Sequence, residues 1–344
     1  MNSGKNPQIP ALTRRATRPK LGLLLCDLRA LCVMPSCTLF PRPACKTSRR
    51  AERQPFTPMK YLLLGLSLCS LSVSALAAKP SVDFHDHLGI QMWSLRDTTK
   101  TDMKAALDMV KGYDLKNIEA AGLGNLTLEQ YVAELKARNL NVVGSHAGYG
   151  LLEKDLKGQI AIAKALGAKY LVCPWVDHGK EGFTEELAHK VAANFNAWGK
   201  ICREAGIQLG WHPHGFEFVK AKSGNETMFD IVARETDPEN LVFEMDVFWV
   251  FHAGQDPVTL LKKYGNRWQL LHVKDIRKGA VTGLSSGSAP PTDNVPVGIG
   301  QIDWPAVLRT SQDLGIQHYL IEDETPSALQ SIPLSLKYLR GLKL

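Results

Sequence analysis

The residues His212-Pro213-His214 lie in the stretch GWHPHGFEF (210–218), directly after an apolar run. Imidazole is the side chain best suited to bind a metal ion or to transfer a proton near neutral pH. In an extended chain, residues two apart point to the same side, so both histidines would face one environment, with Glu217 close behind them. This spacing predicts a metal-binding or proton-transferring site rather than a plain core strand.

Further polar side chains stand where other apolar runs end. They are Glu119, His146, Asp246, His272, Lys274 and Glu322. Buried charged groups are costly unless they pair or bind a metal. The large number of them at the ends of the runs therefore indicates a common site. Asp246, His272 and Glu322 come from three consecutive runs. Carboxylate and imidazole together suit one divalent ion such as Mn²⁺, Zn²⁺, Co²⁺ or Mg²⁺.

The elements that would position these residues are short β-rich runs separated by helical patterns. The runs cover residues 88–95, 116–122, 141–148, 168–176, 207–215, 241–250, 270–276 and 318–324. One helical pattern repeats Leu187, Val191, Phe195, Trp198 and Ile201 at three-to-four spacing, which predicts a buried face. The alternation favours an α/β fold, a closed (β/α)8 TIM barrel, over an open doubly wound sheet, because no glycine-rich phosphate loop follows the first run. Barrel chemistry lies at the carboxyl ends of the strands, where these polar residues fall.

The N-terminal part of the chain differs in charge from the rest. Residues 1–60 contain twelve Lys and Arg but two acidic residues, whereas the remainder sums to about −3. Met59-Lys60, an apolar run and Ala75-Leu76-Ala77 have the three parts of a signal peptide. We therefore expect residues 1–58 to be a non-native or disordered extension, 59–77 a signal peptide and 78–344 one barrel domain. The mature protein is then expected to be exported to the periplasm or secreted, without stable membrane insertion.

Several motifs in register resemble one known family. WHPHGFEF, FEMDVFWV, HVKD, VPVGIGQIDW and LIEDE, in this order, together with the opening IQMWSLRD, resemble the xylose isomerase-like TIM barrel superfamily. The resemblance covers residues 86–344, and within the superfamily it is to the sugar phosphate isomerase/epimerase branch, including inosose dehydratases. It implies a small-molecule carbohydrate substrate and one bound divalent metal ion.

The resemblance also assigns the ligands of that ion. The family's ligand positions fall on Asp246, His272 and Glu322. The fourth position, usually a glutamate, is His212 here, and Glu217 is the competing ligand. Members that act as endonucleases have a histidine three residues after the aspartate, where this chain has Trp249. That difference favours stacking on a sugar ring and a single ion, and the negative charge of the mature chain argues against a nucleic-acid partner.

Such a site could catalyse several reactions. A bound metal ion polarises a carbonyl, so that a base can remove the neighbouring proton and form an enediolate. Reprotonation gives isomerisation or epimerisation, whereas loss of a β-substituent gives elimination, as in a lyase or dehydratase. The candidate acids and bases are His214, Glu217, Glu119 and Glu322, and Lys274 could stabilise an oxyanion.

Glu119, His146 and Trp249 are also candidates for substrate binding. The sequence leaves open the choice between isomerase, epimerase and lyase. It also leaves open a non-catalytic carbohydrate-binding barrel, against which the retained Asp246, His272 and Glu322 count.

Overall fold

The computed structural model describes residues 83–344. The expected extension (1–58), signal peptide (59–77) and cleavage next to Ala77 lie outside the described residues, so they stay predictions. Within the described part of the chain, no helix combines the length and apolar character needed to cross a bilayer.

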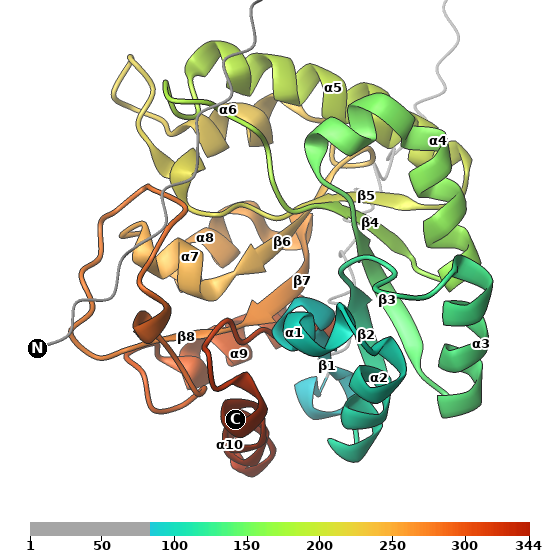
Figure 1. Ribbon diagram of the computed structural model, residues 1–344. Coiled ribbons are helices and arrows are strands. Elements are labelled where there is room, and N and C mark those ends of the chain that lie inside the picture. The colour runs from blue at the N-terminus through green and yellow to red at the C-terminus, as the bar shows by residue number, and fades with distance from the viewer. Residues whose placement is uncertain (1–82) are drawn as a thin grey trace, which may run out of the picture. The chain divides into compact units, whose positions relative to one another are not determined.

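The core of the domain is a closed barrel of eight parallel strands, which confirms the predicted fold (Figure 1). The strands are β1 (Leu88–Gln91), β2 (Asn117–Ala120), β3 (Asn141–His146), β4 (Tyr170–Cys173), β5 (Gln208–Trp211), β6 (Val242–Asp246), β7 (Trp268–Val273) and β10 (His318–Ile321). Neighbouring strands along the chain pair with one another, and β10 closes the ring against β1. Each strand coincides with one of the predicted runs.

Helices connect the strands and surround the barrel (Figure 1). They are α1 (Arg96–Thr99), α2 (Met103–Gly112), α3 (Leu128–Arg138), α4 (Tyr149–Leu166), α5 (Glu185–Glu204), α6 (Met228–Glu235), α7 (Val247–His252), α8 (Pro257–Tyr264), α9 (Trp304–Asp313) and α10 (Ala328–Gly341). Helix α5 buries Val191 and Phe195 as its pattern predicts. The expectation for Ile201 is wrong: this residue is 41% exposed, and Cys202 is buried beside it instead. The buried face is therefore rotated by about one residue near the end of the helix.

The strands end earlier than the apolar runs suggest. β1 gives way to the 3-10 helix η2 (Met92–Leu95), and β6 passes directly into α7. β5 ends at Trp211, so His212, Pro213 and His214 lie in the loop that follows it. The polar side chains at the barrel mouth therefore come partly from strand ends, as Asp246 and His272 do, and partly from the loop after β5.

A second, two-stranded antiparallel sheet lies beside the mouth and was not predicted. It pairs β8 (Asp275–Ile276) with β9 (Asn294–Val295) and closes the base of the loop 277–293. Asp275 fixes the chain that follows, since its carboxylate accepts N–H groups from Gly298 (2.9 Å) and Gly300 (3.1 Å). A Cβ atom on Gly300 would lie 2.1 Å from Oδ1 of Asp275, so this approach requires glycine.

Candidate active site

The polar residues of the strand ends converge inside the mouth of the barrel. Glu244 and Asp246 are two residues apart on β6 and share its inner side, as His272 and Lys274 do at the end of β7. The side chains of Glu244, Asp246 and His272 are fully buried, and Lys274 is 1% exposed. Burial of so many ionisable groups is tolerable only if they neutralise one another or hold an ion.

Asp246, His272 and Glu322 form what we call the upper cluster. Each residue has one nitrogen or oxygen atom that could bind a metal, and these three atoms lie within 4.8 Å of one another. His272 Nδ1 is 3.3 Å from Glu322 Oε2 and 4.0 Å from Asp246 Oδ2. His212 completes the cluster, with its Nε2 4.0 Å from the same Asp246 oxygen. These four are the metal ligands predicted from the sequence, and the structure brings them together.

The upper cluster fits a divalent cation. Oδ1 of Asp246 accepts the N–H of Trp249 (3.0 Å) and so caps α7, whereas Oδ2 is buried without a hydrogen-bond partner. Burial raises the pKa of Asp246 to about 6, against the opposing effect of the Lys274 charge. A buried carboxylate oxygen that accepts no hydrogen bond, close to imidazole and a second carboxylate, is suited to a metal with nitrogen and oxygen ligands.

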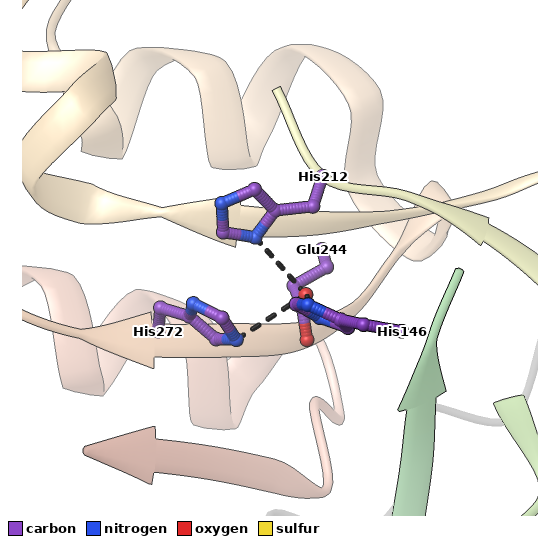
Figure 2. A group of neighbouring side chains, drawn as sticks. All are labelled: His146, His212, Glu244 and His272. Atoms are coloured by element: carbon purple, nitrogen blue, oxygen red, sulfur yellow. Dashed lines mark hydrogen bonds and ion pairs between the residues drawn. The ribbon is translucent and has the colours of Figure 1, made fainter. Parts of the chain in front are cut away.

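A second group lies one layer deeper and is called the lower cluster: His146, His212, Glu244 and His272 (Figure 2). Oε2 of Glu244 is 3.0 Å from His212 Nδ1 and 3.2 Å from both His146 Nε2 and His272 Nε2. Burial would lower the pKa of His146, but Glu119 and Glu244 outweigh that effect and raise it to about 9. His146 in the lower cluster therefore forms an ion-paired layer with Glu119 and Glu244.

Sequence reasoning missed two residues of this layer. Glu244 was not considered, although its position two residues before Asp246 is the signal that could have found it. Gln91, at the end of β1, donates from Nε2 to Glu119 Oε2 (2.7 Å). Glu119 in turn lies 2.7 Å from His272 Nε2 and is fully buried, so it supports the site from below rather than facing the cavity.

His212 and His272 belong to both clusters. Each directs one ring nitrogen to the upper cluster and the other to a carboxylate below, Glu244 or Glu119. Metal-binding histidines usually hold their second nitrogen in this way, because the carboxylate fixes the ring and makes it a better ligand. This arrangement favours the upper cluster over the lower cluster as a cation site, because Asp246 Oδ2 has no hydrogen-bond partner there and the lower carboxylates hold the rings of the two histidines.

Lys274 lies against the upper cluster. Its Nζ is 3.2 Å from Glu322 Oε2 and 3.6 Å from Asp246 Oδ2, and it also donates to Glu324. Burial would lower the pKa of Lys274, but the surrounding carboxylates, Glu322 first, raise it above its usual range. The residue is therefore a protonated amine beside the upper cluster.

His214 and Glu217 differ in where they point. His214 Nδ1 has no hydrogen-bond partner, and burial together with the charges of His212 and Lys274 holds the pKa of His214 well below its usual value. Both carboxylate oxygens of Glu217 instead accept the backbone N–H of His214, at 3.2 and 3.0 Å. Burial raises the pKa of Glu217 to about 8. Glu217 belongs to neither the upper nor the lower cluster.

A cavity of about 530 Å³ opens above the upper cluster. His146, His212, His214, Trp249 and Glu322 contribute to its wall, as do Trp93 and Trp175, which are 43% and 37% exposed. The two exposed tryptophans follow the ends of β1 and β4 and were not singled out from the sequence. Aromatic walls with a few convergent polar groups are typical of small-molecule sites.

Comparison with known proteins supports the predicted relationship. Residues 104–342 match the family model described as xylose isomerase-like TIM barrel. An inosose dehydratase of Mesomycoplasma hyopneumoniae is 26% identical over 238 residues, which are 61% of this chain and 78% of that protein. A sugar phosphate isomerase/epimerase structure from Parabacteroides distasonis has a TM-score of 0.60 and 22% identity, and covers 74% of this chain and 98% of that one. The zinc-containing IOLI protein has a TM-score of 0.56 and 16% identity, and covers 74% and 96%.

Proposed function

Because this chain belongs to the xylose isomerase-like TIM barrel family, we propose that it is a divalent-metal-dependent sugar isomerase or epimerase. Its substrate is a sugar or keto-sugar, and the reaction passes through an enediolate. The observation that carries this proposal is the upper cluster, in which Asp246 Oδ2 is buried without a hydrogen-bond partner beside His272, Glu322 and His212.

The residues of the site have distinct tasks in this reaction. Asp246, His272, Glu322 and His212 would hold the cation, which when bound would polarise a carbonyl and acidify the neighbouring C–H. His214, which lines the cavity above the upper cluster, is the candidate base for that proton. Lys274 Nζ, a protonated donor 3.2 Å from Glu322 Oε2, would return a proton or stabilise the developing oxyanion. Trp249 supports the sugar ring.

Elimination is the second candidate function. Inosose dehydratases are among the proteins that this chain resembles in sequence, and a dehydratase removes water from its substrate. The same base could start that reaction, and Lys274 could then protonate the departing hydroxyl. Isomerisation and elimination share the first step, so proton abstraction is the event to test first.

The experiment measures exchange of the α-hydrogen in D₂O. The protein, loaded in turn with Mn²⁺, Co²⁺, Zn²⁺ or Mg²⁺, is incubated with keto-sugars and an inosose, and deuterium uptake is followed by NMR. We expect uptake with at least one ion, and mass spectrometry of the product distinguishes rearrangement from loss of water. Binding without exchange would instead support a non-catalytic carbohydrate-binding barrel.

Asp246→Asn is the informative variant. An asparagine oxygen can still cap α7, so the fold is retained, whereas the charge needed to hold the cation is lost. We expect exchange to fall to background in this variant. Asp313→Asn, at an exposed position on α9, is the matched control and should leave exchange unchanged. Full exchange by Asp246→Asn would contradict the proposed role of the upper cluster.

A further inference from the structure

The loop after β5 folds around a buried carboxyl group. Glu217 is 1% exposed and lies in the short 3-10 helix η3 (Phe216–Phe218), between the buried rings of Phe216 and Phe218. In the described part of the chain, no cationic side chain pairs with Glu217. Its oxygens accept backbone N–H groups instead, and the N–H of His214 lies 3.0 Å from Oε2. The carboxyl group is therefore tied to the peptide that carries His214.

The ring of His214 depends on this peptide for its orientation. Its centroid lies 5.2 Å from Trp175, 5.7 Å from Trp249 and 4.7 Å from the predicted metal ligand His212. Nδ1 is buried without a hydrogen-bond partner, so no bond to this nitrogen directs the ring. The direction of the ring is left to its contacts with the other rings and to the position of its own backbone.

Burial of a carboxyl group at Glu217 needs a reason, because an ionisable side chain in an apolar environment costs stability. An apolar side chain of similar size would fill the space between Phe216 and Phe218 without that cost. The contact that it could not replace is the hydrogen bond to the His214 N–H. His214 lines the cavity above the upper cluster and Glu217 does not, so Glu217 acts on the cavity only through its neighbour.

We propose that Glu217 is a positioning residue, which holds the His214 peptide and thereby sets the His214 ring at the wall of the cavity. This inference rests on the proposed function, in which His214 removes the α-proton. Glu217 then has a task that involves no contact with the substrate or the metal ion. A base displaced by about 1 Å can lose about 100-fold in rate, whereas a substrate bound by the other residues keeps its affinity.

The test is Glu217→Met, which fills the same space and removes the acceptor. The full chain is loaded with the metal ion, and the keto-sugar or inosose that exchanges its α-hydrogen fastest with the wild type is the probe. We expect kcat per metal-bound protein to fall about 10- to 100-fold, with KM and metal affinity unchanged. Glu217→Gln, whose amide oxygen can accept the same N–H, should restore most of the rate. If Glu217→Met does not fold, Glu217→Ala takes its place.

Asp230→Leu is the matched control. Asp230 Oδ2 also accepts a backbone N–H three residues earlier, that of Thr227 at 2.8 Å, but it lies at the start of α6, outside both clusters. Its loss should lower stability and leave kcat of the metal-bound fraction unchanged. A second measurement needs no substrate: in protein labelled with ¹⁵N-histidine, the amide hydrogen of His214 should exchange faster in Glu217→Met than in the wild type or in Glu217→Gln.

The outcomes separate this inference from the proposed function. A wild-type kcat in Glu217→Met overturns the inference and leaves the proposed reaction intact. An equal loss of kcat in Glu217→Gln and Glu217→Met also overturns it, because the carboxyl group would then transfer a proton itself. Loss of metal affinity in Glu217→Met would make Glu217 a ligand instead. A wild type that exchanges no α-hydrogen with any probe overturns both proposals.

Discussion

At the scale of single residues, the two ring nitrogens of imidazole let one histidine contact both clusters of the site. His212 and His272 each reach the upper cluster with one nitrogen and a buried carboxylate with the other. A metal-binding histidine usually donates its second ring N–H to a nearby acceptor, and the buried carboxylates are such acceptors. The ligands and their supports therefore form one unit.

Metal affinity tests which residues belong to this unit. We expect His212→Ala and His272→Ala to weaken metal binding to a similar degree, each by more than the ~10- to 100-fold typical of losing an outer partner. Glu217→Gln should leave the affinity unchanged, because its carboxylate accepts the His214 N–H instead. Calorimetric titration of the three variants is the measurement. Loss of binding in Glu217→Gln with full binding in His212→Ala would make Glu217 the fourth ligand.

The supporting role of Glu244 is a separate prediction. Glu244→Gln keeps an oxygen near His212 but removes the charge that holds both histidine rings. We expect metal affinity to fall by about 10- to 100-fold while the metal ligands remain present. Glu235→Gln is the control, since Glu235 pairs with His189 at 2.8 Å on the surface, away from the site. If both variants bind metal equally well, the lower cluster does not support the ligands.

The sequence predicted some of these residues and not others for a physical reason. Asp246, His272 and Glu322 could be found because each ends an apolar run that has to be a barrel strand. Glu244 lies two residues before Asp246 and therefore shares its side of β6, so the same strand pattern could have predicted it as well. The position of Lys274 Nζ beside Glu322 depends on side-chain rotamers, which no spacing in the sequence encodes.

At the scale of elements, close packing of helices on the barrel limits which residues each helix can carry. Gly199 lies on the buried side of α5, where a Cβ atom would be 2.0 Å from the backbone oxygen of Asn240. Asn240 immediately precedes the chain that enters β6, the strand that carries Asp246. A side chain at Gly199 would therefore push the helix away from the strand that supports the site.

Two glycine substitutions should have opposite effects on stability. Gly199→Ala forces a helix and a backbone apart, and we expect it to destabilise the fold by about 1–3 kcal/mol. Gly112→Ala, at the end of α2, meets no atom within 4 Å and should stabilise by up to ~1 kcal/mol, because alanine favours the helix. Denaturant unfolding of both variants measures the difference. Similar stability in the two would show that α5 can shift without cost.

At the scale of the whole molecule, the barrel was predictable because its strands alternate with amphipathic helices throughout residues 88–324. The periodicity fixed the order of the strands but not their ends, because an apolar run continues into a buried loop or helix, as β6 continues into α7. The β8–β9 sheet has two residues in each strand, too few for any periodic pattern. That sheet could therefore be found only in the structure.

The stability of the whole fold should depend on pH through Glu217. Burial raises the pKa of Glu217 from 4.5 to about 8. Below pH 4.5 both the folded and the unfolded chain carry the proton, so this group has no effect. Between pH 4.5 and 8 the unfolded chain releases the proton while the folded chain keeps it. Stability therefore falls as pH rises through this window, by at most about 1.4 kcal/mol per pH unit.

Glu217→Gln tests this dependence because glutamine is neutral at every pH and can still accept the His214 N–H. We expect the variant and the wild type to have similar melting temperatures at pH 5, and the variant to melt higher at pH 8. Scanning calorimetry at both pH values measures the gap. Glu153→Gln, an exposed carboxylate on α4, should show no such pH-dependent gain. A wild type that matches Glu217→Gln at pH 8 would mean that Glu217 ionises without cost, and hence that water reaches it behind the His212-Pro213-His214 loop.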